Sequence, residues 1–381
     1  MNLLYFFNFP EYVTLFQRRF SIYFILGHLG LGISFLVNGW FCLRLKLPLD
    51  IYCTLYLVAV LSFYGSAWLR KAWLGHEHYV LLRSVLFIHL TIGGTLGLWG
   101  VSYEVALHFL DLLAIAIAWV IALGRLGCQT VGCCEGRAYR GSWYVAYPRL
   151  GSKTRGIRLI PVQLMESIFA FSLAWVGVLV KLKGISAGEF WISFWLLYTS
   201  GRYIFEFFRG DIDRPYWLGF SEAQWIGTVI WGILIGASLL TRLPIQVWHY
   251  VLATLGLSVT LLWAIWRSQQ KVPWYQLTQP LHLQEFGQAA LDSQLTNGLQ
   301  ITRRHINVSV MQVEPQKYLY TISHQNHPLP EVWAKRLFRH LQLTRYPEQR
   351  TEMRTGSTGM YHMLRYQSGD KPRPNKKPTQ L

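Results

Sequence analysis

The sequence predicts an all-α membrane bundle of seven or eight transmembrane helices, followed by a small soluble α+β domain. Hydrophobic residues make up 52% of the 381 residues and charged residues only 14%, whereas an ordinary soluble chain carries roughly 25% charged residues. A helix that crosses a bilayer needs about 20 consecutive apolar residues. Seven such stretches precede residue 242, and an eighth candidate runs from Val247 to Trp266. The seven lie near residues 20–42, 51–69, 80–101, 103–123, 161–181, 188–208 and 223–241.

The chain is strongly basic, with a formal net charge of +17. Such an excess suits either nucleic acid or an anionic membrane surface, and the apolar stretches favour the membrane. We therefore expect membrane lipids, and no nucleic acid, among the partners. The first ten residues lack the basic start and the cleavage site of a signal peptide, so we expect the first span to direct insertion.

The apolar stretches stop near Arg267, where polar residues and prolines suggest a linker. We therefore expect a membrane domain over residues 1–267, a soluble α+β domain over residues 268–369 and a disordered basic tail over residues 370–381. Alternating and amphipathic patterns predict the elements of the soluble domain. They are strands at 306–310, 318–322 and 360–366 and a helix at 329–341.

Three segments place charged residues at the ends of apolar stretches. A charge near hydrocarbon costs about 2.5–3.5 kcal/mol and is functional by default. In the first segment, four glycines stand between Arg125 and Arg137 or directly before them. Glycine lets the backbone approach a ligand closely, and the planar guanidinium of arginine binds phosphate oxygens in pairs. This segment therefore predicts a site for a phosphate-bearing substrate.

The second segment carries Arg202 and Glu206, which are four residues apart and share one helix face with Tyr198. An alternative is that the two charges only neutralise each other inside the bundle. Arg209 follows at the helix end, where snorkelling toward lipid headgroups is the simpler explanation. The third segment places Glu166 at the start of the fifth span, where an ordinary N-terminal helix carboxylate would look the same.

Three cysteines, Cys128, Cys133 and Cys134, raise the alternative of a zinc or iron–sulfur site. Their spacing argues against it, because the chain has no Cys-x-x-Cys pair and the nearest histidines, His89 and His108, lie in other spans. Small residues that let helices pack closely are the preferred explanation. We therefore expect no metal and no cofactor.

In this order and at these intervals, the segments resemble the prolipoprotein diacylglyceryl transferases, polytopic inner-membrane enzymes of bacteria. The family's signature, Gly-Arg-x-Gly-Asn-Phe-x-Asn-Gly-Glu-x-x-Gly, is matched at both ends of Gly124–Gly136 and at Gly132. Its later pattern, Tyr-x-x-x-Arg-x-x-x-Glu-Phe-Phe-Arg, is met in full by Tyr198–Arg209, and Gln224–Trp225 follows. An intramembrane Asp that precedes the signature arginine by fourteen residues corresponds to Asp111.

The resemblance covers roughly residues 15–242. It implies transfer of the diacylglyceryl group of phosphatidylglycerol to the lipobox cysteine of a preprolipoprotein, with release of glycerol phosphate, by a multi-pass protein of the bacterial inner membrane. The implied partners are phosphatidylglycerol, the signal peptides of preprolipoproteins and membrane lipids. Arg125 and Arg202 would bind the phosphate and stabilise its charge, Glu206 would orient Arg202, and Tyr198 would hydrogen-bond the headgroup. We expect further substrate-binding residues at Gly124, Gly127, Gly132, Glu135, Gly136, Arg137, Arg209, Asp111 and Glu166.

Several positions depart from the family's pattern. Cys128 replaces the signature Asn, and Cys133 replaces the signature Glu, for which Glu135 is the nearest substitute. Ile92 stands where the family has a histidine, so His89, about one turn earlier, is the candidate for the base that deprotonates the thiol. The alternative is a relative that binds phospholipid or lipoprotein without transfer, or that uses another acceptor. A transporter is disfavoured, because the sequence shows no internal repeat with broken helices.

Overall fold

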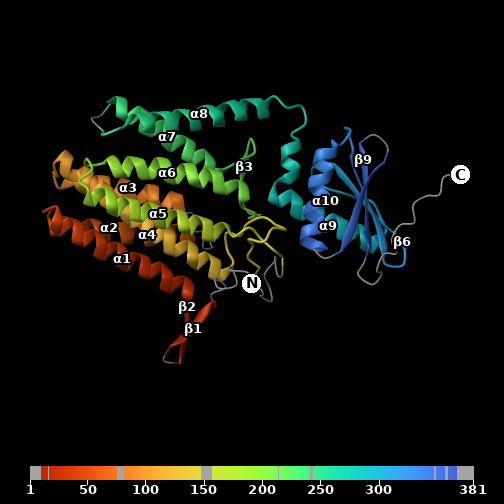
Figure 1. Cartoon of the computed structure of the whole chain (residues 1–381), viewed down its shortest axis with the longest axis horizontal. Helices are drawn as coiled ribbons and strands as arrows, with labels where there is room; N and C mark the ends of the chain where they lie inside the picture. Colours follow the sequence, from red (N-terminus) through yellow and green to blue (C-terminus); the bar gives the residue numbers. More distant parts are fainter. Residues whose placement is uncertain are drawn as a thin grey trace.

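The computed structural model describes the chain from residue 10 to residue 366 with short gaps. The described residues are 10–15, 17–74, 81–146, 157–212, 214–240, 243–346, 349–356 and 359–366. Eight helices run side by side in the N-terminal part, and a sheet with two helices forms the C-terminal part (Figure 1). The eight helices are α1 (Ile22–Arg44), α2 (Leu49–Leu74), α3 (Leu81–Leu98), α4 (Tyr103–Val131), α5 (Val162–Leu182), α6 (Glu189–Phe205), α7 (Glu222–Leu240) and α8 (Val247–Ser268).

Each of the eight apolar stretches that the sequence predicts falls on one of these helices, so the polytopic bundle is confirmed. Six helices of the described chain, α1, α2, α4, α5, α7 and α8, are long and apolar enough to cross a membrane. The other two are shorter: α3 contains the apolar helix Ser84–Leu98, and α6 has 17 residues. Large apolar side chains such as Leu36, Leu90 and Leu262 are exposed on the helix surfaces, as a lipid environment requires.

Helix α4 lies at the centre of the bundle. Ala114, Ile115 and Ala118 on this helix are fully buried, and α1, α5 and α6 pack against it. Small residues bring the helices together, since a methyl group added at Gly30 of α1 would lie 3.2 Å from the Val120 Cα atom of α4. Such close backbone approach is typical of membrane helix pairs. The middle of α4 is therefore closely packed by its neighbours.

Two short hairpins that the sequence did not predict lie at the ends of the bundle. In the first, β1 (Tyr12–Leu15) pairs with β2 (Arg18–Ser21) before α1. In the second, β3 (Tyr216–Trp217) pairs with β4 (Phe220–Ser221) between α6 and α7. Its two turn residues, Leu218 and Gly219, have φ angles of 49° and 76°, as a tight type I′ hairpin requires.

The end of α8 docks on this second hairpin. The Arg267 guanidinium donates a hydrogen bond to the Leu218 carbonyl oxygen, at 2.9 Å. It also lies over the rings of Phe220, Trp263 and Tyr275, with 4.7–4.8 Å from the guanidinium carbon to each ring centroid. Arg267 therefore fastens the last membrane helix to the segment that follows it.

The C-terminal part is a small α+β unit, which confirms the predicted class. Its antiparallel sheet has the order β5-β6-β7-β9-β8. Helices α9 and α10 lie on the side of the sheet that faces the membrane helices (Figure 1). The elements are a short 3-10 helix η3 (Trp274–Thr278), α9 (Pro280–Thr296), β5 (Gln300–Ile301), β6 (Ile306–Glu314), β7 (Lys317–His324), α10 (Glu331–Arg345), β8 (Arg350–Thr355) and β9 (Met360–Tyr366).

This unit has a core of its own, made by residues between Leu277 and Met363. Alternate residues of β6 are buried, as the sequence pattern predicts. Helix α9 and strand β8 were not predicted. The domain boundary near Arg267 stays a prediction, and the predicted disordered tail at 370–381 lies outside the described residues.

A histidine of α10 links this unit electrostatically to the membrane part. Burial, together with the positive charges of Arg137, Arg345 and His282, lowers the pKa of the His340 imidazole to about 4. Arg137 belongs to the loop that follows α4, so α10 lies near the end of the bundle where that loop emerges.

Candidate functional site

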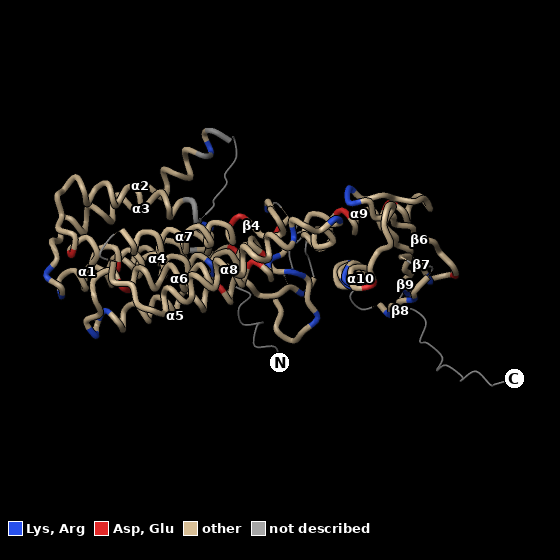
Figure 2. The backbone as a smooth tube through the Cα atoms, turned by 90° about the horizontal axis from the view of Figure 1, so that it is seen from above, with Lys and Arg blue, Asp and Glu red and all other residues tan. Residues whose placement is uncertain are grey.

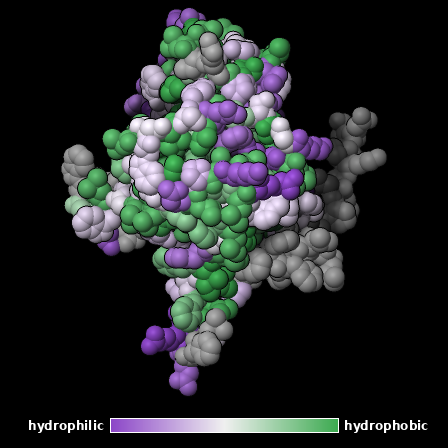
Figure 3. Space-filling model, turned by 90° about the vertical axis from the view of Figure 1, so that its left-hand side faces the viewer, coloured by the Kyte–Doolittle hydropathy of each residue, from purple (hydrophilic) through white to green (hydrophobic). Residues whose placement is uncertain are grey.

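Three helices bring charged side chains to one end of the bundle. Arg125 comes from the last turns of α4, Glu166 from the second turn of α5, and Arg202 from the last turn of α6. Lys, Arg, Asp and Glu residues gather at the end that faces the C-terminal unit, whereas most of the helical region is uncharged (Figure 2). The opposite end, seen in Figure 3, also presents hydrophilic side chains among hydrophobic ones.

Glu166 is the shared partner of three buried arginines. Its Oε2 atom lies 2.5 Å from Arg125 Nε, and its Oε1 atom accepts a hydrogen bond from Arg202 and lies 3.4 Å from Arg209 Nη1. All four side chains are less than a tenth exposed. We call Arg125, Arg202, Arg209 and Glu166 the arginine cluster. The sequence predicted all four residues as site residues but did not show that they share one carboxylate.

A second set of ion pairs continues from the arginine cluster. Glu206 Oε1 lies 2.5 Å from Arg202 Nη2, and both oxygens of Glu206 accept hydrogen bonds from Arg214 at 2.5–2.6 Å. The Asp211 Oδ2 atom lies 2.6 Å from Arg209 Nε and 2.9 Å from Arg214 Nε, so Asp211 links these two arginines. Sequence reasoning missed Arg214 and Asp211, although they follow Arg209 closely in a polar stretch of the chain.

The two sets together contain four arginines and three carboxylates. These seven side chains therefore carry one surplus positive charge. Buried ions of one sign need a partner of the other, and guanidinium groups match the oxygens of phosphates and carboxylates. The arrangement can accept one further monovalent anion.

Tyr198 joins the arginine cluster from α6. Its ring is buried and stacks on Phe194, with 5.5 Å between ring centroids and 7° between ring planes. Arg125 and Arg202 are the nearest positive charges to its hydroxyl group. The structure thus places Tyr198 near Arg125 and Arg202, and its hydrogen bond with the headgroup stays a prediction.

The turn after α4 pairs with the segment after α6. The Arg137 N–H donates to the Phe208 carbonyl oxygen, and the Gly210 N–H donates to the Glu135 carbonyl oxygen, each at 2.9 Å. The Arg137 Nε–H donates to the Arg209 carbonyl oxygen at 3.0 Å. Glu135 and Arg137 therefore lie beside the arginine cluster, and their role in binding substrate stays a prediction.

Two glycines of this segment, Gly127 and Gly136, are closely packed against the protein itself, and the expected approach to a ligand stays a prediction. A methyl group at Gly136 would clash with the Ile160 carbonyl oxygen, and one at Gly127 would lie 3.0–3.3 Å from Tyr23. Gly132 ends α4 with φ 68°, in the left-handed region that favours glycine. Gly124 has no neighbour within 4 Å of an added methyl group.

Asp111 lies far from the arginine cluster. It precedes Arg125 by fourteen residues on α4, which corresponds to about 21 Å along the helix. Its carboxylate is 2.5 Å from Lys181 Nζ and accepts hydrogen bonds from the Gly188 and Trp191 backbone N–H groups, each at 2.9 Å. Asp111 thus binds the N-terminal end of α6, where carboxylates are stabilised by the helix dipole. The structure does not bring it to the predicted substrate site.

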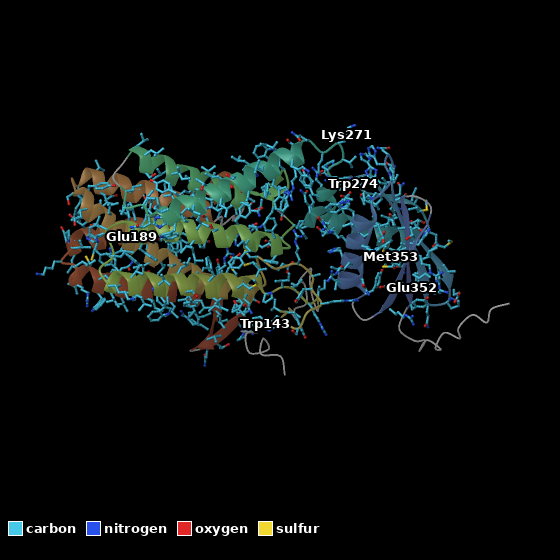
Figure 4. All side chains as sticks on the ribbon, turned by 45° about the horizontal axis from the view of Figure 1, so that its top comes forward. Trp143, Glu189, Lys271, Trp274, Glu352 and Met353 are labelled. Carbon is cyan, nitrogen blue, oxygen red and sulfur yellow. The ribbon has the colours of Figure 1, made fainter. Side chains whose placement is uncertain are left out.

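The two ends of the bundle can be compared in one view. Glu189, the first residue of α6, lies at the end where Asp111 binds, and Trp143, in the loop that follows the arginine end of α4, lies at the opposite end (Figure 4). The predicted site residues therefore divide between two separate places, and only the arginine end gathers a set of them.

His89 is also separate from the arginine cluster. Its Nε2 atom accepts hydrogen bonds from the indole N–H groups of Trp191 and Trp195, at 3.1 and 3.2 Å. Its Nδ1 atom lies 2.8 Å from the Val85 carbonyl oxygen. Both ring nitrogens are thus engaged, and the structure does not bring His89 to a position from which it would deprotonate a thiol at the arginine cluster.

The three cysteines after Arg125 lie closer together than their spacing suggested. The Sγ atoms of Cys128, Cys133 and Cys134 all lie within 4.8 Å of one another. Hydrogen bonds from the other two thiols, together with the charges of Arg125 and Arg209, hold the pKa of the Cys134 thiol well below its usual value. The thiols therefore form a cluster directly beside the arginine cluster.

Comparisons with known proteins bear on this end of the bundle. Residues 87–242 match the family model described as prolipoprotein diacylglyceryl transferase. A phosphatidylglycerol–prolipoprotein diacylglyceryl transferase 2 of Clostridium perfringens is 33% identical over 161 residues, which cover 39% of this chain and 58% of the relative. The Clostridium tetani enzyme is 33% identical over 34% of this chain and 52% of its own length.

A third relative aligns with this chain over a longer stretch, at lower sequence identity. The phosphatidylglycerol–prolipoprotein diacylglyceryl transferase of Dehalococcoides mccartyi is 27% identical over 53% of this chain and 82% of its own length. The chain thus spans little more than half the length of the two clostridial relatives. Its apolar helices and these matches make it a multi-pass protein of the bacterial inner membrane.

Proposed function

Because the chain belongs to the prolipoprotein diacylglyceryl transferase family through residues 87–242, we propose that it transfers the diacylglyceryl group of phosphatidylglycerol to a cysteine thiol. The proposed acceptor is the lipobox cysteine in the signal peptide of a preprolipoprotein. The products are a thioether-linked lipoprotein precursor and glycerol phosphate. Phosphatidylglycerol, lipoprotein signal peptides and the surrounding membrane lipids are the proposed partners.

The arginine cluster is the observation that carries this proposal. A phosphodiester is a monoanion, and the ion pairs at this site leave one positive charge in surplus. Each guanidinium offers five N–H donors in a fixed fork, more than a single carboxylate engages. Arg125 and Arg202, held by Glu166 and lying near Tyr198, can therefore bind the phosphate while Tyr198 donates to the headgroup.

The same residues suit the bond-breaking step. As the thiolate attacks the glycerol carbon, the carbon–oxygen bond breaks and its electron pair passes to the phosphate oxygen. The charge on the departing phosphate grows, and positioned donors in a site shielded from water stabilise such charge. Glu206, with its ion pairs to Arg202 and Arg214, fixes the guanidinium groups in place before the reaction. Arg209 adds a third positive charge at the same point.

A second candidate function is phospholipid or lipoprotein binding without transfer, or with another acceptor. Two observations favour it: Ile92 replaces the histidine of the family's pattern, and His89 has both ring nitrogens engaged. Under this alternative the arginine cluster binds the same headgroup, but the thiol is not deprotonated.

We also propose that residues 268–369 form a soluble domain distinct from the membrane domain of residues 1–267. The separate apolar core between Leu277 and Met363 supports this division. The surplus of basic residues after Arg267 supports contact of this domain with anionic lipid headgroups.

The test supplies radiolabelled phosphatidylglycerol and a lipobox peptide to the purified full chain and measures label on the peptide cysteine. We expect transfer, and a loss of about 100-fold or more in Arg202→Ala, as for other removed charge-stabilising donors. The matched control is Arg44→Ala, whose guanidinium lies over Trp40 at the end of α1 and should retain transfer. Lipid binding that depends on Arg202, without transfer at high enzyme concentration, would establish the second candidate instead.

A further inference from the structure

The thiols of Cys128, Cys133 and Cys134 converge although they come from different backbone conformations. Cys128 lies in the last turn of α4, whereas Cys133 and Cys134 belong to the turn that follows. Gly132 and Cys134 have φ angles of 68° and 60°, and these two left-handed residues fold the turn back over the helix end. A left-handed residue other than glycine costs of order 1–3 kcal/mol, so the surrounding structure holds Cys134 in place.

The convergence matches the dimensions of a thiolate metal site. Zinc binds thiolate sulfur at about 2.3 Å in tetrahedral geometry, which places the sulfur atoms roughly 3.8 Å apart. The three Sγ atoms lie within 4.8 Å of one another. Side-chain rotations that shorten these separations by about 1 Å would place the three sulfur atoms at three corners of a tetrahedron around the metal.

The surroundings match the charge of such a site. Three thiolates and one divalent ion carry a net charge of −1, and Arg125 and Arg209 act directly on Cys134. These two guanidinium groups lie beside the thiols and favour the negative charge of such a site. The turn is also supported from outside, since the Gln163 side-chain N–H donates to the Cys133 carbonyl oxygen at 2.9 Å. Such outer-shell hydrogen bonds orient metal ligands.

We propose that Cys128, Cys133 and Cys134 bind a thiophilic divalent cation such as Zn²⁺, with the fourth coordination position open to the acceptor thiol. Zinc sites with three protein ligands and one open position are the catalytic kind. Among the described residues, no fourth cysteine, histidine or carboxylate completes this group. Cys133 is exposed, so the open position is accessible from outside the bundle.

The role of the open position rests on the proposed function. A thiol that coordinates zinc loses its proton outright, here to water. Its sulfur then attacks the glycerol carbon of phosphatidylglycerol, the carbon–oxygen bond breaks, and the electron pair leaves with the phosphate as glycerol phosphate. The metal would supply the deprotonation, because Ile92 replaces the histidine of the family's pattern and both ring nitrogens of His89 are engaged.

The first experiment measures metal binding alone, on the purified and reduced full chain. Cd²⁺ titration should reach one equivalent per chain with a thiolate-to-cadmium charge-transfer band in the ultraviolet. Substitution of any one of the three by serine should weaken binding by more than about 100-fold, since even loss of an outer-shell group costs 10–100-fold. Cys53→Ser, which changes an exposed cysteine on α2, is the matched control and should bind as the parent does.

Cadmium titration of the unsubstituted chain tests the site even if a serine variant does not fold. Absence of the band in the reduced parent, or a band that survives in Cys128→Ser and Cys134→Ser, would overturn the site. So would a disulfide between two of the three cysteines in the protein as isolated, since sulfur atoms joined at about 2.05 Å cannot serve as separate thiolate ligands.

The second experiment separates the metal proposal from the proposed function. In the Co²⁺-loaded chain, a lipobox peptide should change the visible cobalt spectrum, and the same peptide with serine in place of cysteine should not. Transfer should fall at least tenfold after chelation and return with Zn²⁺. Equal transfer with and without metal would refute the acceptor role alone. A cobalt response to the thiol peptide with no transfer at any metal load would sustain the site and refute the transferase function.

Discussion

The carboxylate of Glu166 offers the sharpest test of the arginine cluster. Glu166→Gln keeps the size and one acceptor oxygen of the side chain but removes its charge. The substitution would leave Arg125, Arg202 and Arg209 without the anion that they share at separations of up to 3.4 Å. Removing one member of a buried ion pair costs roughly 3–5 kcal/mol, because the remaining charge stays buried and unpaired.

The structure points to the lower end of that range. Arg202 keeps its ion pair with Glu206, and Arg209 keeps its ion pair with Asp211. We therefore expect a loss of about 3 kcal/mol in the free energy of unfolding. Since 1 kcal/mol shifts the midpoint of a domain of this size by about 2–4 °C, the thermal midpoint should fall by roughly 6–12 °C.

Thermal unfolding of the purified chain in a neutral detergent, followed by tryptophan fluorescence, measures this shift. Phosphatidylglycerol should then raise the midpoint of Glu166→Gln more than that of the parent, because the lipid phosphate supplies the missing negative charge. A lipid with a zwitterionic headgroup should give less protection. Glu189→Gln, at the opposite end of the bundle (Figure 4), is the matched carboxylate control.

Two outcomes would refute this reasoning. A midpoint shift below about 2 °C would mean that the buried arginines do not depend on Glu166. Equal protection of parent and Glu166→Gln by phosphatidylglycerol would mean that the phosphate does not enter the arginine cluster, and the proposed headgroup site would have to lie elsewhere.

Three further predictions concern other parts of the chain. Gly136→Ala should destabilise the fold and lower transfer, because its methyl group would clash with a backbone carbonyl, whereas Gly124→Ala should leave both unchanged within about 1 kcal/mol; thermal melts and the transfer assay compare them. Asp111→Asn should lower the thermal midpoint, and adding Lys181→Met should recover part of the loss, as a double-mutant cycle would show. The fold favours the neutral form of His340, whose pKa is about 4 in the folded chain and about 6.5 in the unfolded chain. Its contribution to stability is therefore full above pH 6.5 and is lost as the pH falls toward 4. His340→Gln should flatten this pH dependence of the unfolding free energy in calorimetry, and an unchanged slope would contradict the prediction.

Hydropathy predicted the positions of the membrane helices well, because a bilayer requires long apolar helices wherever they occur in the fold. Short elements escaped prediction for a physical reason. The hairpin β3–β4 has only two residues in each strand, too few for an alternating pattern. Helix α9 contains several glutamines and a glycine and has a weak apolar face, so its packing against the sheet decides its conformation.

The candidate site, like the fold, could be predicted from the sequence only in part. The four-residue interval between Arg202 and Glu206 predicted their ion pair, because Glu206 directly follows the last turn of α6 and keeps the helical direction. The role of Glu166 as shared partner could not be predicted, since it depends on how α4, α5 and α6 pack. The sequence analysis grouped Asp111 with Arg125 as a substrate-binding residue, although fourteen residues of one helix already separate the two by about 21 Å.

The cysteines illustrate a different limit. Spacing rules for metal ligands hold for regular turns and helices, and the interval from Cys128 to Cys133 fits none of them. Two left-handed residues on either side of Cys133, Gly132 and Cys134, bring the thiols together. Sequence periodicity carries no signal for such a turn.

Because Asp111 holds the N-terminal end of α6, a small tilt of the helix at that end displaces its other end. Its fixed end lies at Trp191, and its free end carries Arg202, about 16 Å away along the axis. A tilt of about 4° at the fixed end would move the far end by roughly 1 Å, and misplacement on that scale can reduce a rate about 100-fold. The position of the Arg202 guanidinium, which we propose binds the phosphate, therefore depends on the Asp111 carboxylate at the other end of α6.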